Sequence, residues 1–141
     1  MPYVDIKDCR IHYISIESIN KSMGEGENVF FLHGLGGNIY NWAYQTKYFS
    51  ETHNVVSLEL PGHGRSSGKG GAAIDYYTGL IREFMTIMDL KSIVFVGHSM
   101  GGMIMFAYLP QGQAASEIKS FVAIAVPVVV FHPLSDPLEL L

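Results

Sequence analysis

The feature that most constrains how this chain folds is the segment Val94-Phe95-Val96-Gly97-His98-Ser99-Met100-Gly101-Gly102. Apolar and β-branched residues precede Gly97, and a helical pattern follows at 103–109, which together predict a strand, a tight turn and a helix. Because Gly97 and Gly101 carry no Cβ atom, the strand and the helix can cross closely at this turn. Gly-x-Ser-x-Gly in this context predicts a nucleophile elbow with Ser99 at its apex. An ordinary glycine-serine turn is the alternative interpretation.

Composition limits the classes of protein to which the chain can belong. Its 141 residues suffice for one domain with a hydrophobic core, and 48% of them are hydrophobic, which excludes a disordered tail. The net charge of -4 and the lack of a basic cluster argue against a nucleic-acid partner. The longest apolar run, 121–131, is too short to span a bilayer and contains Pro127.

Cysteine and histidine usage bears on redox compartment and on metals. Cys9 is the only cysteine, so the sequence predicts no internal disulfide, and a cytoplasmic, reducing location is the natural interpretation. The histidines do not occur at metal-ligand spacing, and no phosphate-binding or dinucleotide-binding motif is present. We therefore expect neither a metal nor a cofactor.

Strand and helix patterns alternate along the chain. Two short strand-like runs flank 7–10 and predict an N-terminal antiparallel hairpin. The remaining elements are predicted in this order: a strand at 29–32, a helix at 41–49, a strand at 55–58, a helix from Ile74 to Met88, the strand and helix around Ser99, and a strand at 121–126. This alternation predicts an α/β fold, with a mostly parallel sheet and helices on both faces.

Three glycine-bearing turns follow strands in this arrangement, at 33–37, 61–66 and 97–102. Because the carboxyl ends of parallel strands meet at one edge of a sheet, we expect these turns to converge there. A serine nucleophile also needs N–H donors for the oxyanion that forms on attack. The candidate donors are the backbone N–H groups of Met100 and Leu35. The residues expected to shape the elbow and the first turn are His33, Gly34, Gly97, His98 and Gly101.

The three turn motifs resemble those of the α/β-hydrolase family in order and spacing: His33-Gly34-Leu35-Gly36-Gly37, Pro61-Gly62-His63-Gly64-Arg65-Ser66 and Gly97-His98-Ser99-Met100-Gly101-Gly102. The likeness extends from about Tyr3 to about Val126, and the pattern is similar to that of the family's small esterases, thioesterases and carbon–carbon-bond hydrolases.

This resemblance implies a serine hydrolase that acts on carboxylic esters or related acyl compounds, with a small-molecule acyl substrate. It implies that Ser99 is the nucleophile and that Leu35 and Met100 form the oxyanion hole. Glu59 stands where relatives often carry aspartate, an acid that is usually structural in the family.

The resemblance also implies that part of the usual site is missing. The family's catalytic acid and histidine follow later strands, and its domains commonly run to ~200–250 residues. We therefore expect residues 1–126 to be the N-terminal part of a hydrolase domain, giving a truncated fold. Residues 127–141 are expected to form an irregular tail where a lid region starts. On this basis the chain alone is expected to be catalytically incomplete.

Six histidines could still supply a base to Ser99. Five have structural interpretations: His33, His63 and His98 as residues that shape turns, and His12 and His53 as solvated or capping residues. His132 follows the last predicted strand, with Asp136 four residues later, so it is the candidate base, although this order is reversed relative to the family.

A protein that retains the hydrolase fold without catalysis is the second hypothesis. It would bind a small acyl ligand or a partner. The strand at 121–126 would leave an apolar, unpaired sheet edge, which favours self-association or a partner at that edge.

Overall fold

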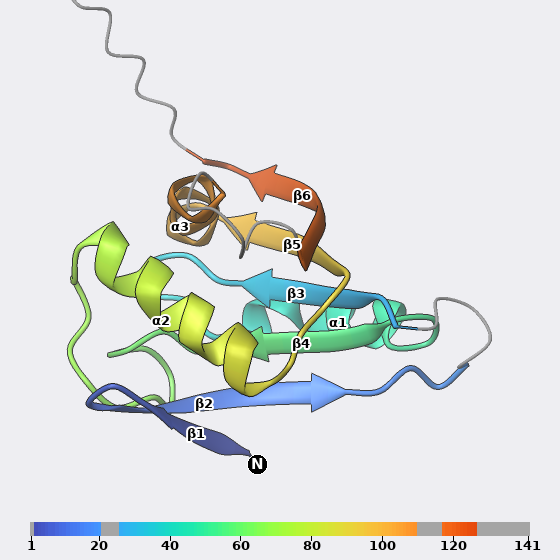
Figure 1. The fold of residues 1–141 in the computed structure, drawn as a ribbon, viewed down its shortest axis with the longest axis horizontal. Coiled ribbons are helices and arrows are strands. Elements are labelled where there is room, and N and C mark those ends of the chain that lie inside the picture. Colours follow the sequence, from blue (N-terminus) through green and yellow to red (C-terminus); the bar gives the residue numbers. More distant parts are fainter. Residues whose placement is uncertain (1, 21–25, 110–116, 127–141) are drawn as a thin grey trace, which may run out of the picture.

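The computed structural model describes residues 2–20, 26–109 and 117–126. They form one six-stranded sheet with helices on both faces (Figure 1). The strands are β1 (Tyr3–Ile6), β2 (Cys9–Ile16), β3 (Asn28–Leu32), β4 (Asn54–Leu58), β5 (Ile93–His98) and β6 (Ile118–Ile124). The helices are the 3-10 helix η1 (Ile39–Trp42), α1 (Ala43–Phe49), α2 (Ile74–Ile87) and α3 (Met100–Tyr108).

The sheet has the strand order β1-β2-β4-β3-β5-β6. β1 and β2 form the predicted antiparallel hairpin, whose turn holds Lys7 at a φ of 54°. β2 is antiparallel to β4, and the strands β4, β3, β5 and β6 are mutually parallel. The prediction of a mostly parallel α/β sheet with an N-terminal hairpin is therefore confirmed.

The continuous apolar run of β3 is explained by burial on both faces of the sheet. Successive residues of a strand point to opposite faces. Phe30 accordingly joins the core under α2 and α3, where its ring lies 4.6 Å from that of Phe95. Phe31 joins the smaller core under α1 and stacks on Trp42 at 5.0 Å. A central strand covered on both faces has no polar side, so the run 29–32 shows no alternation.

Helix α2 confirms the periodic pattern found between Ile74 and Met88. Its buried residues include Tyr77, Ile81 and Phe84, which lie three and four positions apart and face the sheet. Asp75, in the first turn, stabilises the helix because its negative charge lies near the positive end of the helix dipole. The helix lies across β3 and β4 (Figure 1) and thereby closes the larger of the two cores.

Strand β6 differs in its bounds from the predicted strand at 121–126. It begins at Ile118 and ends at Ile124, because its main chain pairs with β5 from Ile93 onward and Ala125 turns away at a φ of 50°. Backbone pairing requires no apolar side chain, so Ser120 pairs with Val94, and Lys119 lies in the strand at an irregularity in the register. β6 is the edge of the sheet in the described residues, and Val122 and Ile124 on it are exposed.

Within the described ranges, α-helices are all too short or too polar to cross a membrane.

Candidate active site

Ser99 lies at the junction of β5 and α3, with a backbone conformation that a non-glycine residue rarely adopts. Its φ is 50° and its ψ is -117°. The close crossing around it depends on two glycines. A Cβ atom at Gly97 would lie 2.7 Å from the Gly102 nitrogen, and one at Gly101 would lie 2.4 Å from the Leu32 oxygen. Both separations are too short for non-bonded atoms, so larger residues are excluded and the chain turns sharply at Ser99.

Backbone hydrogen bonds hold the elbow in place. The Ser99 N–H donates to the Ile124 carbonyl of β6 at 2.9 Å, and the Met103 N–H donates to the Ser99 carbonyl at 3.1 Å. Met100 is the first residue of α3, and the first N–H groups of a helix have no acceptor within the helix. The Met100 N–H therefore needs an acceptor from outside α3.

The turn after β3 lies directly against the elbow. β3 and β5 are neighbours in register, with Leu32 opposite Gly97. A Cβ atom at Gly34 would lie 3.0 Å from the Ser99 Cβ. Leu35, the next residue, is 74% exposed. The structure thus brings the first turn and the elbow together at one sheet edge, as the alternating pattern predicts.

The buried ring of His33 holds this turn through two hydrogen bonds. Its ring is buried, and its Nδ1–H donates to the Gly34 carbonyl at 2.7 Å. Its Nε2 accepts the Leu60 N–H at 3.0 Å. Because an amide can only donate, Nε2 must be unprotonated and the ring neutral. Burial lowers the pKa of His33, which favours the same neutral form. His33 is therefore a turn-shaping residue in this geometry, as expected.

The neutral form of His33 in the folded state predicts that the fold becomes less stable as the pH is lowered. The unfolded His33 titrates at its usual pKa of about 6.5, above the lowered pKa of the folded state, so the unfolded chain binds more protons as pH falls. The stability that neutral His33 supplies is present above about pH 6.5 and is lost as pH falls through the folded pKa. We expect the melting temperature to fall more between about pH 7 and pH 5 in the wild type than in His33→Asn. If the melting temperatures of the wild type and His33→Asn fall equally with pH, the prediction is contradicted.

The turn after β4 lies beside the turn after β3, at the carboxyl ends of the parallel strands. Its His63 donates from Nδ1 to the Pro61 carbonyl at 3.0 Å, and the His63 and His33 rings lie 5.0 Å apart. His98, in contrast, is exposed at the end of β5. The expectation that His63 serves the turn agrees with its contacts.

The expectation that His12 is solvated or caps an element is wrong. His12 is fully buried, because β2 lies between β1 and β4 and one of its faces packs on the core. Its Nδ1–H donates to Glu59 Oε2 at 3.0 Å. The same oxygen accepts the Arg65 N–H. Glu59 thus joins the hairpin to the turn after β4, which fits the structural role expected of this acid.

His53, which is expected to be solvated or to cap an element, is partly exposed. It precedes β4, at the sheet edge opposite Ser99, and its Nε2 lies 3.7 Å from the partly exposed Glu27 carboxylate. The candidate base His132 and its partner Asp136 lie outside the described residues.

Two contacts of the site were missed at the sequence level. One is the Ile124 carbonyl that holds the Ser99 N–H, and the other is the His12–Glu59 pair. No local signal marks the first, because it depends on which strand pairs with β5. Clusters of three or more metal-ligating side chains do not occur in the part of the chain that the structure describes.

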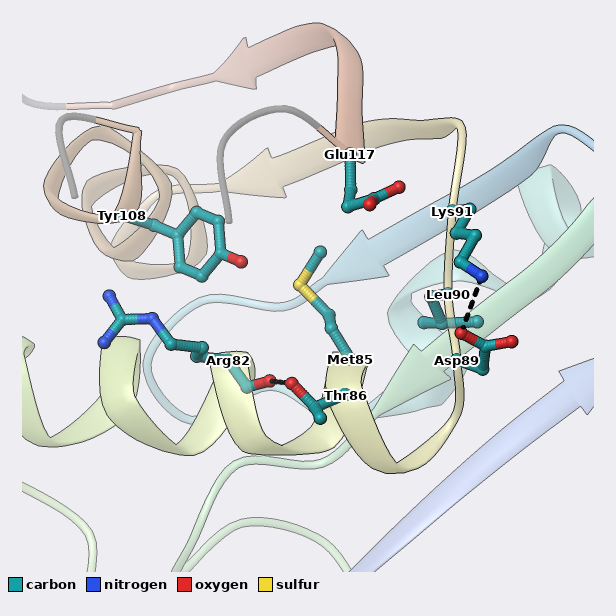
Figure 2. A pocket seen from close by; sticks show the side chains of 8 residues that line it. All are labelled: Arg82, Met85, Thr86, Asp89, Leu90, Lys91, Tyr108 and Glu117. Carbon is teal, nitrogen blue, oxygen red and sulfur yellow. Dashed lines mark hydrogen bonds and ion pairs between the residues drawn. The ribbon is translucent and has the colours of Figure 1, made fainter. Parts of the chain in front are cut away.

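A pocket of about 210 Å³ opens near the amino ends of β5 and β6, at the end of the sheet opposite Ser99 (Figure 2). Its lining residues are Arg82, Met85, Thr86, Asp89, Leu90, Lys91, Tyr108 and Glu117. Lys91 lies two residues before β5 and Glu117 directly precedes β6, whereas Ser99 follows β5. The pocket and Ser99 are therefore separated by about 20 Å of strand. Asp89 and Lys91 already pair at 3.0 Å. This pocket therefore cannot present a substrate to Ser99.

Comparison with known proteins places this geometry in context. The chain matches the family described as alpha/beta hydrolase fold over residues 27–140. It is 34% identical over 101 residues to the dihydrolipoyllysine-residue acetyltransferase component of the acetoin cleaving system of Cupriavidus necator, which covers 71% of this chain and 25% of that protein. It is 35% identical over 82 residues to (E)-2-((N-methylformamido)methylene)succinate hydrolase of Acinetobacter baylyi, which covers 57% of this chain and 31% of that protein.

The structure is also similar to that of Est816, described as an N-acyl homoserine lactone degrading enzyme. The TM-score is 0.75 and the sequence identity 27%, over 89% of this chain and 45% of the other. The chain spans less than half the length of each of these three proteins.

Proposed function

Because the chain belongs to the alpha/beta hydrolase fold family, we propose that it carries the nucleophile of a serine hydrolase acting on carboxylic esters or related acyl compounds. The observation that carries this proposal is the backbone of Ser99. A φ of 50° with a ψ of -117° costs a non-glycine residue about 1–3 kcal/mol. Glycine would adopt this conformation more easily, so a serine there is better explained by the chemistry of its side chain than by packing.

In the proposed reaction, the Ser99 Oγ attacks the acyl carbon while a base takes its proton. The oxyanion that forms accepts hydrogen bonds from the Met100 and Leu35 N–H groups, each worth about 2.7–4 kcal/mol in such sites. Collapse of this intermediate expels the alcohol, which receives the proton, and water then hydrolyses the acyl-serine. The close approach of the turn at Gly34 to Ser99 supports a common position for both donors.

The base is proposed to come from outside the described residues. His33 and His63 are both engaged in their turns, and His12 is bonded to Glu59. His132, with Asp136, is the candidate within this chain. We further propose that 1–126 is the N-terminal part of the hydrolase domain and that a lid region starts within 127–141, so that the chain alone is catalytically incomplete.

The second candidate function is a non-catalytic protein that retains the fold. The observation that favours it is the exposed edge strand β6, where Val122 and Ile124 present apolar side chains beside backbone groups with which no strand of the described residues pairs. In this case, the edge binds a partner or a second copy of the chain, and Ser99 has no activated hydroxyl.

Labelling with a fluorescent phosphonate that reacts with activated serines separates the two candidates. We expect an adduct on Ser99 that forms slowly, because the usual base is missing from the described residues, and that is found by peptide mass spectrometry and absent from Ser99→Ala. Ser92→Ala is a matched control, because Ser92 precedes the same strand and also has a positive φ of 53°. It should label like the wild type. Absence of labelling from a folded wild type, or equal labelling of Ser99→Ala, would support the non-catalytic alternative.

A further inference from the structure

Ser66, half-buried in the turn after β4, joins this turn to the N-terminal hairpin. Its hydroxyl accepts the His12 N–H of β2 at 2.9 Å and donates to the Glu59 carbonyl at 2.6 Å. Its own N–H donates to the His63 carbonyl at 3.0 Å, which fixes the main chain that carries the hydroxyl. The proposed hydrolase mechanism assigns no role to this hydroxyl.

The Glu59 carbonyl belongs to the peptide group that continues to Leu60. This peptide is trans, so its carbonyl and its N–H lie in one plane and point in opposite directions. While the carbonyl is bound to Ser66, the peptide directs the Leu60 N–H to Nε2 of His33, at 3.0 Å. Ser66 therefore orients the donor that keeps the His33 ring neutral.

The same geometry is repeated on the other side of the His33 ring. The His33 Nδ1–H donates to the Gly34 carbonyl at 2.7 Å, and the Gly37 N–H donates to the same oxygen at 3.0 Å. The N–H at the opposite end of that peptide is that of Leu35, the proposed oxyanion donor. The hydrogen bonds thus run in one direction, from the hairpin to the turn that carries this donor.

A chain of hydrogen bonds that run in one direction does more than hold two turns together. Each carbonyl that accepts a hydrogen bond polarises its peptide, and the N–H of that peptide becomes a stronger donor, by about 10–30% per bond. Figure 1 shows that β3, β4 and β5 end at the same side of the sheet, so both turns lie beside the elbow. The chain of hydrogen bonds therefore ends where the oxyanion would form.

We propose that Ser66 is a positioning residue for the oxyanion hole. Its hydroxyl orients the Glu59–Leu60 peptide, and the His33 ring transmits this orientation to the Leu35 N–H. The proposal rests on the proposed hydrolase function, in which Leu35 donates to the oxyanion.

Amide hydrogen exchange of the full chain, followed by nuclear magnetic resonance, tests the proposal. The Leu60 and Gly37 amides, which we call the reporter amides, donate within the two turns. In Ser66→Ala, their exchange should speed up at least about tenfold more than that of the Phe95 amide in the central strand β5. A general loss of stability would instead speed up all three amides alike.

Three further variants make this result specific. Ser67→Ala is the matched control, because the hydrogen bonds of Ser67 within the described residues are to Arg10 and Gly62. It should leave the reporter amides unchanged relative to Phe95. Ser66→Thr keeps the hydroxyl and should restore wild-type exchange. If Ser66→Ala does not fold, Ser66→Cys replaces it; its weakly donating thiol should speed up the reporter amides about threefold relative to Phe95.

Labelling of Ser99 by the phosphonate separates this proposal from the proposed function. The phosphonyl oxygen takes the place of the oxyanion, so Ser66→Ala should slow labelling about tenfold, whereas Ser67→Ala should label like the wild type. If the wild type is not labelled, the proposed function fails, and the reporter amides still decide whether Ser66 holds the turn.

Three results would overturn the proposal. The reporter amides of Ser66→Ala could speed up no more than Phe95, or Ser67→Ala could affect them as much as Ser66→Ala does. In the third, a folded Ser66→Ala would be labelled at the rate of a labelled wild type. Ser66 would then contribute to the fold without positioning the oxyanion hole.

Discussion

Replacing Ser99 with glycine is expected to abolish whatever ester hydrolysis this chain performs and, at the same time, to stabilise its fold by about 1 kcal/mol. The hydroxyl that attacks the acyl carbon is lost, so hydrolysis should fall to the rate without catalysis. The gain in stability arises because glycine adopts a φ of 50° without the clash that a Cβ atom causes. Ser99→Ala should abolish hydrolysis without this gain.

Hydrolysis of p-nitrophenyl acetate and butyrate measures the first effect, and urea denaturation followed by Trp42 fluorescence measures the second. Ser92→Gly is the matched control, because Ser92 has a φ of 53° at the other end of β5. It should gain stability and keep its hydrolysis rate. If folded wild type and Ser99→Ala hydrolyse the esters equally, the chain is catalytically incomplete. If Ser99→Gly is no more stable than Ser99→Ala, the strain argument fails.

Gly101→Ala is expected to destabilise the fold by about 3 kcal/mol, at the upper end of the usual cost of overpacking. Its new Cβ atom would lie 2.4 Å from the Leu32 oxygen and 2.7 Å from the His33 oxygen. Both are main-chain atoms of β3 and its turn, so neither can rotate away as a side chain could. Helix α3 must move off β3, which separates the Met100 N–H from the turn that carries Leu35.

The free energy of unfolding in urea checks this prediction. Gly70→Ala is the control, because its Cβ atom would meet its nearest neighbour, the His63 ring, at an ordinary 3.6 Å and its φ is not positive. We expect that variant to stay within about 0.5 kcal/mol of the wild type. If Gly101→Ala lowers the free energy of unfolding by no more than this control does, the elbow tolerates a wider separation of α3 and β3 than this structure has.

Several elements and the elbow could be predicted because their signals are local. Gly97, Ser99 and Gly101 lie within five residues, and strand, turn and helix patterns follow one another there. The periodicity between Ile74 and Met88 similarly predicted α2. The convergence of the 33–37 turn and the elbow followed from a general property of parallel sheets, and the close approach of Gly34 to Ser99 agrees with it.

The contacts that could not be predicted join residues far apart in the chain. The expectation that His12 is solvated or caps an element fails, because nothing near it in the sequence shows that β2 lies beside β4 and that His12 reaches Glu59. The start of β6 at Ile118 also depended on its partner, because pairing with β5 includes residues with no apolar pattern. Tyr40, Tyr44 and Tyr48 are spaced by four residues in the sequence, but only the burial of Trp42 and Thr46 shows which faces of η1 and α1 pack on the sheet.

The sequence by itself determined the class of fold, the order of its elements and the position of Ser99 at a strained turn. Each of these depends on residue preferences over a few consecutive positions. The tertiary structure decided the contacts of the site: the neutral form of His33, the bond from Ser99 to Ile124 and the buried His12–Glu59 pair. The physical reason is that hydrogen bonds and burial depend on neighbours in space, and the sheet order that sets those neighbours is a property of the whole chain.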